Sequence, residues 1–278
     1  MALSGWRSIE AAAGALAVIV LPCPAAAQPA ASLRELCAER PGKDTPPCIV
    51  DAGHLLVETG LASVSRDRDG PMETVRSAFG EVLARLGVTD HSEVQLGFTP
   101  LGVVRIKDRS TGLQRTVHGP GDLTGAFKLS LRNPDGSGTS AAIRAFVTAP
   151  TGRSEIGAGA WEGGVIIPLS FDLSERWSLT LDPEIDLLGD EDGHGHHVAL
   201  AGVVSLSHDL GHGLGASAEL WTSFERDPAD HSTQGSFDLA LAWTPESQPN
   251  LQFDTEVDLG LTAATPGIEA ALGISYRF

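Results

Sequence analysis

The densest group of side chains able to do chemistry runs from Asp190 to His197, where carboxylates and imidazoles are interleaved with glycine. Carboxylate oxygens and imidazole nitrogens suit a divalent cation, and His194, His196 and His197 are the candidate imidazole ligands. The same stretch is compatible with a solvated polar loop, because its glycines leave the ligands without fixed spacing. The sequence therefore predicts no metal and no cofactor, and it names these histidines only as candidates.

Ser207, His208 and Asp209 supply the residue types of a hydrolytic triad. Adjacent residues of a strand point alternately to opposite faces, so these three side chains cannot align as nucleophile, base and orienting acid. The pattern indicates the end of a strand and the start of a turn. No catalytic residue is predicted.

Two further sets of ionisable residues are separated along the chain. The first is basic and comprises Arg85, Arg105, Lys107, Lys128, Arg132 and Arg144. The second is acidic and comprises Asp182, Glu184, Asp186, Glu219, Glu225, Asp238, Asp254, Glu256 and Asp258. Most members alternate with apolar neighbours, which predicts strands with one charged and one apolar face.

Alternating segments recur from Gly53 to the end of the chain, and about twelve can be counted, an even number as in bacterial outer-membrane barrels. They are Gly53–Ser65, Val75–Val88, Glu93–Lys107, Asp122–Arg132, Ser140–Ala149, Gly164–Leu173, Trp177–Leu188, Val198–Ser207, Leu214–Glu225, Ser236–Thr244, Leu251–Leu261 and Ile268–Phe278. Compact turns and longer loops alternate between them. The fold class predicted is all-β, a transmembrane antiparallel up-and-down barrel with a basic arc facing an acidic arc across its lumen. A soluble β-sandwich or barrel is the alternative.

The last segment places Ile268, Leu272, Ile274 and further apolar residues on one face and ends on an aromatic residue. Gly273, Tyr276 and Phe278 resemble the glycine and the two aromatic positions of the assembly signal of outer-membrane barrels. This resemblance implies closure of a barrel by the last strand and recognition by the barrel assembly machinery.

The first residues predict export. Arg7 precedes the apolar run Ala11–Leu21, and small residues follow at Ala25–Ala27, as in a cleaved signal peptide. We expect a signal peptide at 1–27, a periplasmic segment at 28–52 and the barrel at 53–278. In the oxidising periplasm, Cys37 and Cys48 are expected to form a disulfide within that segment. The net charge of −17 argues against a nucleic-acid partner.

Short strings along the chain resemble one family in both content and order. They are Leu36-Cys37, Arg40-Pro41, Gly53-His54, Val57-Glu58, Gly87-Val88-Thr89-Asp90, Val94-Gln95-Leu96, Phe98-Thr99-Pro100, Gly119, Gly121-Asp122, Lys128, Trp177-Ser178-Leu179, Glu184 and Asp186. The chain is similar in these strings to outer-membrane transporters grouped under the meta-pathway of phenol degradation. The resemblance implies a barrel that passes small, aromatic or hydrophobic compounds, and it brings no catalytic set.

The sequence therefore predicts an outer-membrane porin or facilitator in contact with outer-membrane lipid, with small-molecule solutes as its partners. One alternative is an outer-membrane enzyme of the lipid-hydrolase type, which needs a serine and a histidine converging at the lipid-facing rim. Another is a non-conducting barrel whose lumen is filled by side chains. The acid excess predicts a weakly cation-preferring pore.

Overall fold

The computed structural model describes residues 33–229 and 231–278, so the predicted signal peptide lies outside the described residues. Residues 34–278 form one compact unit. Its strands are β1 (Leu55–Asp69), β2 (Met72–Thr89), β3 (Ser92–Phe98), β4 (Leu101–Asp108), β5 (Gln114–Gly119), β6 (Leu123–Arg132), β7 (Thr139–Ala149), β8 (Glu162–Ile166), β9 (Leu169–Asp172), β10 (Trp177–Gly189), β11 (His196–Gly211), β12 (Leu214–Arg226), β13 (His231–Trp243), β14 (Leu251–Gly260) and β15 (Ile268–Arg277). No helix in this part of the chain has the length and apolarity to span a bilayer.

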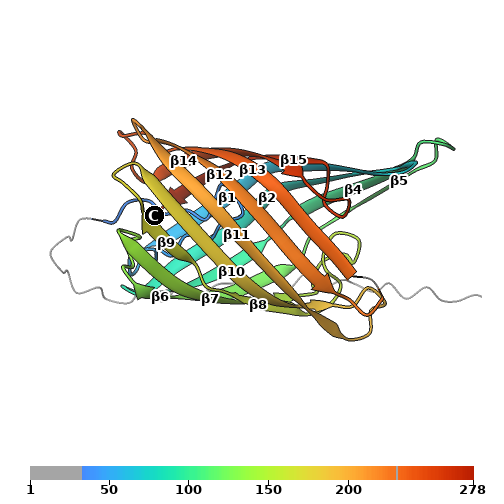
Figure 1. Ribbon diagram of the computed structural model, residues 1–278, viewed down its shortest axis with the longest axis horizontal. Helices are drawn as coiled ribbons and strands as arrows, with labels where there is room; N and C mark the ends of the chain where they lie inside the picture. The colour runs from blue at the N-terminus through green and yellow to red at the C-terminus, as the bar shows by residue number, and fades with distance from the viewer. Residues whose placement is uncertain (1–32, 230) are drawn as a thin grey trace, which may run out of the picture. The chain divides into compact units, whose positions relative to one another are not determined.

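The strands form a closed antiparallel barrel, because β15 pairs with β14 on one side and with β1 on the other (Figure 1). Three strands of the wall are each interrupted once, between β3 and β4, between β5 and β6, and between β8 and β9. Each interruption contains a proline, namely Pro100, Pro120 or Pro168, which lacks the N–H that a ladder requires. The wall of the described chain thus has twelve strands, which confirms the predicted fold class.

The barrel has the reverse of the polarity of a soluble protein. In β14, Gln252, Asp254 and Asp258 are buried, whereas the alternating residues Phe253 and Leu259 expose more than two fifths of their surface.

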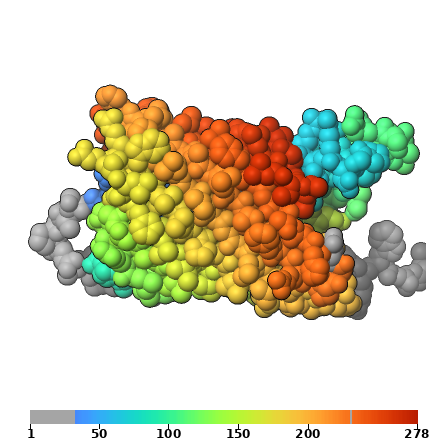
Figure 2. Space-filling model, in the orientation of Figure 1, coloured from blue at the N-terminus to red at the C-terminus, as the bar shows by residue number. Residues whose placement is uncertain are grey.

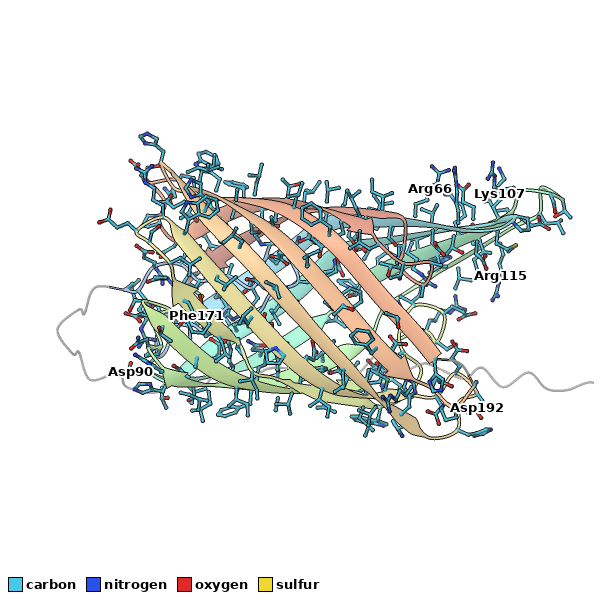
Figure 3. All side chains as sticks on the ribbon, viewed as in Figure 1. Arg66, Asp90, Lys107, Arg115, Phe171 and Asp192 are labelled. Atoms are coloured by element: carbon cyan, nitrogen blue, oxygen red, sulfur yellow. A yellow bond between two sulfur atoms is a disulfide. The ribbon has the colours of Figure 1, made fainter. Side chains whose placement is uncertain are left out.

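 Side chains project outward along the strands (Figure 3) and form the outer surface of the wall (Figure 2), and many of the exposed ones are apolar like these two. In water such a surface would be strongly unfavourable, but against lipid it is the favourable one. The inside-out pattern therefore places the barrel in a membrane.

The two ends of the barrel differ. One end carries the start of β1 and the end of β15, together with tight turns such as Thr89–Ser92, and we call it the periplasmic end. At the opposite, outer end, β1, β2, β4 and β5 project beyond the other strands (Figure 1). The loop predicted between Asp108 and Gly121 contains β5, which extends this projecting sheet.

Strands β1 to β4 exchange their inner and outer faces at one level of the wall. Gly60 pairs with Glu81 and Ala62 pairs with Phe79, so Leu61 and Gly80 are both left out of the ladder. Gly80 has a φ of 68°, a conformation that glycine adopts at little cost. The break between β3 and β4 lies beside it, because Val82 pairs with Phe98 and Phe79 pairs with Leu101. Beyond this level, residues of the opposite parity face inward.

Candidate functional site in the barrel interior

The interior contains part of the predicted basic arc. Arg85 and Lys128 are fully buried at inward positions of β2 and β6, and Arg144 of β7 lies beside them, half-buried. Arg132 is exposed at the periplasmic end of β6, next to an irregularity in the β6–β7 register. Three of the six basic residues therefore lie together inside the barrel.

The placement of Arg105 and Lys107 in the lumen is wrong. Both residues are exposed and share the outward face of β4 with Leu101, whereas Gly102 and Val104 face inward and are buried. The prediction assumed one continuous strand from Glu93 to Lys107, but the break at Pro100 shifts the alternation by one residue. A shift of one residue moves every following side chain to the other face.

All nine residues of the predicted acidic arc occupy inward positions of β10, β12, β13 and β14. Asp182, Glu219, Asp238, Asp254 and Asp258 are buried, and the other four are half-buried: Glu184, Asp186, Glu225 and Glu256. The basic cluster on β2, β6 and β7 and the acidic positions on β10 to β14 lie on separate arcs of the wall. What neither the charges nor their spacing indicated is a chain segment between the two arcs.

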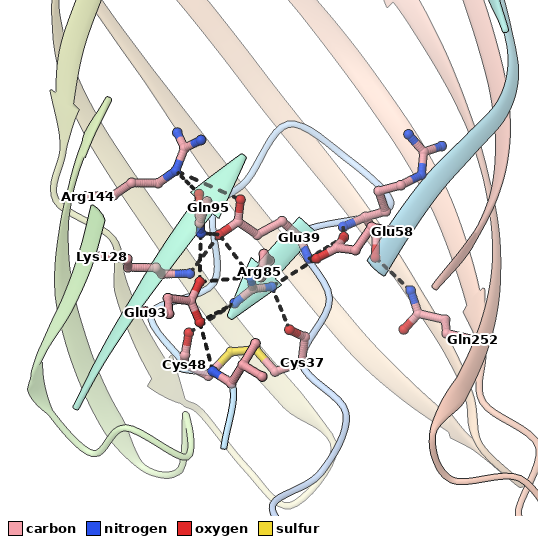
Figure 4. A network of polar contacts seen from close by, with 12 residues as sticks. Cys37, Glu39, Cys48, Glu58, Arg85, Glu93, Gln95, Lys128, Arg144 and Gln252 are labelled. Atoms are coloured by element: carbon pink, nitrogen blue, oxygen red, sulfur yellow. Dashed lines mark hydrogen bonds and ion pairs between the residues drawn. A yellow bond between two sulfur atoms is a disulfide. The ribbon is translucent and has the colours of Figure 1, made fainter. Parts of the chain in front are cut away.

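Residues 34–50 form this segment, which we call the inserted segment, and it lies within the barrel (Figure 4). The prediction that 28–52 forms a periplasmic segment is therefore corrected for its described part. The disulfide between Cys37 and Cys48 is confirmed and closes the segment into a loop, with a Cα–Cα distance of 6.4 Å. The backbone donates hydrogen bonds to carboxylates of the wall at Lys43, Thr45 and Val50, which reach Glu219, Asp182 and Glu93.

Glu39 of the inserted segment lies in the basic cluster (Figure 4). Its carboxylate accepts hydrogen bonds from Lys128 Nζ at 2.9 Å and from Gln95 Nε2 at 2.6 Å. Arg85 lies 3.7 Å from the same carboxylate, and Arg144 lies 3.9 Å from it. Burial alone would raise the pKa of Glu39, but Lys128, Arg85 and Arg144 together lower it. Glu39 is therefore held as a carboxylate.

Arg85 connects the inserted segment to the wall. Its guanidinium pairs with Glu93 at 2.8 Å and with Glu58 at 3.0 Å, and it donates to the carbonyl oxygen of Cys37 at 2.8 Å. Glu58 in turn accepts the backbone N–H groups of Glu39 and Arg40, each at 2.9 Å. Every charge in this group has a partner of opposite sign, which is the condition for burying it at acceptable cost.

Arg40 and Lys43 bind the acidic arc on the opposite side. Arg40 Nη2 lies 3.1 Å from Asp254 Oδ1, and Lys43 Nζ pairs with Asp258 and lies 3.6 Å from Asp238. The backbone N–H of Gly42 donates to Glu256. The three carboxylates of β14 predicted to line an open pore therefore hold the inserted segment.

Two glycines make room for Arg40 at the seam where the barrel closes. Gly60 of β1 pairs with Gly273 of β15. A Cβ atom on Gly273 would overlap Arg40 Nε and lie 2.8 Å from Asp254 Oδ1, and one on Gly60 would lie 3.1 Å from Arg40 Nη1. Gly273 was predicted only as part of an assembly signal, so its contact with Arg40 adds a local reason for glycine.

Asp44 occupies the least favourable electrostatic position of the inserted segment. Burial raises the pKa of its carboxyl well above the usual value, and the nearby carboxylates of Glu219 and Asp182 raise it further. A charge on Asp44 therefore opposes seating of the segment, whereas the charges on Glu39, Arg40 and Lys43 favour it.

Cavities lie on both sides of the inserted segment. One of about 400 Å³ is lined by residues near the periplasmic end, including Ser178, Ser207 and Gln252. Another, of about 380 Å³, is lined by wall residues nearer the middle, including Glu81 and Asp122. Arg40 and Asp44 line both cavities. A third cavity of about 450 Å³ shares Glu81 and Asp122 and continues toward the outer end.

The predicted metal ligands are only partly brought together. His197 Nδ1 lies 3.0 Å from Asp190 Oδ1 and 3.4 Å from Asp227 Oδ2, and all three side chains are at least nine-tenths buried. His194 is exposed, and His196 Nε2 instead contacts the carbonyl oxygen of Trp161 at 2.8 Å. The group that could hold a divalent cation is therefore Asp190, His197 and Asp227.

Ser207 and His208 do not converge. Ser207 lines the periplasmic cavity, whereas His208 stacks on Trp177 with a ring separation of 4.1 Å. Of the predicted assembly signal, Tyr276 and Phe278 are exposed and contact each other edge to face at 4.8 Å.

Sequence reasoning missed the acceptors Glu58 and Glu93 as well as the inserted segment. Both glutamates fall at inward positions of segments that were predicted as strands, so alternation alone could have identified them. The partners Glu39, Arg40 and Lys43 carry no periodic signal. The one sequence feature that set these three residues apart is their position between Cys37 and Cys48.

The closed wall, the apolar exterior and the charged interior define an outer-membrane β-barrel protein. A family model described as "Putative MetA-pathway of phenol degradation" matches residues 38–278, and the chain belongs to this family. A comparison with curated proteins gives no match.

Solved structures show the same fold. The COG4313 outer membrane channel from Pseudomonas putida F1 superposes with a TM-score of 0.65 at 16% identity, over 86% of this chain and 99% of that one. The NanC porin superposes with a TM-score of 0.50 at 9% identity, over 81% of this chain and all of that one. At these identities the likeness concerns the fold.

Proposed function

We propose that this protein is an outer-membrane channel for small solutes and that the inserted segment controls passage through it. The observation that carries the proposal is the pair of cavities that both contact Arg40 and Asp44. A path between them needs movement of this short stretch only, without any opening of the wall. The family description supports small aromatic compounds such as phenols among the solutes.

The inserted segment suits a movable barrier. It is irregular chain, held by ion pairs and by hydrogen bonds to side chains, and it adds no strand to the ladder of the wall. The disulfide limits how far the loop can extend when it leaves its seat. Passage of solute would therefore require the ion pairs and hydrogen bonds of this segment to be exchanged for contacts with water.

The cavities on the outer side favour cations. Their acidic lining residues outnumber the basic ones. The acidic residues are Glu39, Asp44, Glu58, Glu81, Asp122 and Glu269, and the basic residues are Arg40, Lys43 and Arg76. Carboxylates around a water-filled path raise the local concentration of positive ions. A weakly cation-preferring channel therefore remains the proposal, with its selectivity on the outer side of the inserted segment.

A planar bilayer tests this function directly. The purified protein, verified as a folded barrel by its heat-dependent shift on a denaturing gel, should give discrete conductance steps with a reversal potential on the cation-selective side. Absence of steps from folded protein, both with and without reductant, would instead support the non-conducting structural barrel. The fully buried network around Arg85 is the observation that favours this second candidate.

An enzymatic role is not proposed, because Ser207 and His208 lie in different surroundings. We further propose that Gly273, Tyr276 and Phe278 are recognised by the barrel assembly machinery. Their place in the closing strand β15 supports this role. Contact of the exposed apolar side chains with outer-membrane lipid completes the proposal.

A further inference from the structure

The projecting sheet at the outer end sorts its charges by face. Along β1 the order is Arg66, Asp67, Arg68 and Asp69, so alternation sends the two arginines to one face and the two aspartates to the other. Strand β4 does the same, because Arg105 and Lys107 alternate with Ile106 and Asp108. The register aligns the cations of both strands on the same face across β2.

This face, which we call the basic face, consists of Arg66, Arg68, Glu73, Arg105, Lys107 and Arg109. One row across the strands joins Arg66, Val75 and Arg105. The next row joins Arg68, Glu73 and Lys107. Neighbouring strands lie about 5 Å apart, so the cationic groups gather within one small area. Figure 3 shows Arg66 and Lys107 on the projecting part.

The basic face has too few carboxylates to neutralise it. Glu73 pairs with Arg66 at 2.8 Å, with Arg68 at 3.4 Å and with Arg109 at 4.0 Å. Among the residues that the structure describes, Arg105 and Lys107 form no ion pair. The basic face thus has five cationic residues and one carboxylate, in a chain whose net charge is −17. Such a concentration of positive charge favours an anionic ligand.

The basic face lies directly beside exposed apolar residues of the same strands. Val64, Phe79 and Leu101 lie on the same outward face, on the side toward the membrane, and each is at least two fifths exposed. Arg66 is the next outward residue after Val64. The basic face therefore begins where the apolar, lipid-facing band of these strands ends, at the level of the lipid headgroups of the outer leaflet.

We propose that the basic face binds the phosphate groups of an anionic lipid in the outer leaflet. Guanidinium groups bind phosphate oxygens through paired hydrogen bonds, and a β-sheet holds several of them on one rigid surface. Glu73 orients Arg66 and Arg68 while leaving net positive charge. This inference does not depend on whether the barrel conducts.

The test uses the full-length protein in uncharged detergent, titrated with a diphosphorylated disaccharide lipid and with the same lipid after removal of its phosphates. The triple variant R66Q/R105Q/K107Q should bind the phosphorylated lipid about a hundredfold more weakly, because each basic residue near an anionic surface contributes about fivefold. Binding by the wild type should weaken as salt is raised.

Arg115 provides the matched control. It belongs to the same projecting sheet, pairs in register with Ile106 on the opposite face and forms an ion pair with Glu155 at 2.8 Å. R115Q should bind within twofold of the wild type. Glu73→Gln should bind more tightly, because it removes the one carboxylate of the basic face. This gain keeps the proposal testable if the triple variant fails to fold.

Three results would overturn the proposal. They are equal binding of the triple variant and the wild type, equal binding of the dephosphorylated lipid, and loss of lipid binding in R115Q as large as in the triple variant. Inorganic phosphate distinguishes the two sources of the anion. Competition by phosphate at the concentration of the lipid would show a site for free phosphate and would reject the lipid.

Discussion

The three acidic residues of β14 that hold the inserted segment should control how often the channel conducts. Asp254 contacts Arg40, Glu256 contacts Gly42 and Asp258 contacts Lys43, so each of the three carboxylates holds one residue of the stretch 40–43. The amide variant D254N/E256Q/D258N keeps the shapes of these side chains and removes their charges. We expect it to favour displacement of the inserted segment and to raise the open probability in a planar bilayer.

The magnitude follows from the three contacts. A hydrogen bond to a buried charged group contributes roughly 1.5–3 kcal/mol. Arg40 and Lys43 keep 20% and 30% of their side-chain surface exposed, so solvent screening reduces each contribution to about 1 kcal/mol. Three contacts then give about 3 kcal/mol. Since 1.4 kcal/mol is a factor of ten, the equilibrium between seated and displaced segment should shift by roughly a hundredfold.

The control removes charges of the same arc that do not touch the inserted segment. Glu184 and Asp186 lie at inward positions of β10, where they pair in register with Ile166 and Gly164 of β8. E184Q/D186N should move the reversal potential toward anions with little change in open probability. An unchanged open probability in the β14 variant, with a change in the control, would refute the assignment of β14 as the anchor.

Three further predictions concern the inserted segment. Burial raises the pKa of Asp44 in the seated state, so the stability that its protonated carboxyl gives this state is fully present below the ordinary pKa and is lost as pH rises through the raised value. Wild-type open probability should therefore increase with pH over this range, by up to about tenfold per pH unit, and Asp44→Asn should flatten the pH titration of conductance. Gly273→Ala should displace Arg40 and raise the conductance of those barrels that show the heat-dependent gel shift, whereas Gly125→Ala, where a Cβ meets nothing within 4 Å, should leave conductance unchanged. Replacing Cys37 and Cys48 by serine should remove about 3 kcal/mol of loop constraint, and wild-type protein treated with reductant should show the same rise in conductance while the serine variant ignores reductant.

The strand pattern was largely predictable because successive residues of each wall strand alternate between lipid and the barrel interior. Lipid on one side and a charged interior on the other impose a period of two, and β14 shows it in every residue from Gln252 to Leu259. The same periodicity gave the inward positions of the acidic arc correctly. It failed at Pro100, because a single break in a strand reverses the face of Arg105 and Lys107 without changing the composition around them.

The sequence by itself determined the fold class, the closing strand and the charge of the interior, since each of these follows from the alternation of apolar and polar residues within single strands. The disulfide followed from two cysteines close together in an exported chain. Only the tertiary structure decided where residues 34–50 lie, because their partners are far away along the chain: Arg40 meets Asp254, and Lys43 meets Asp258. Such pairings depend on closure of the barrel, which brings β1 beside β15, and no local period encodes them. Closure of the wall thus places the basic and the acidic residues on either side of the inserted segment, which they hold in the barrel.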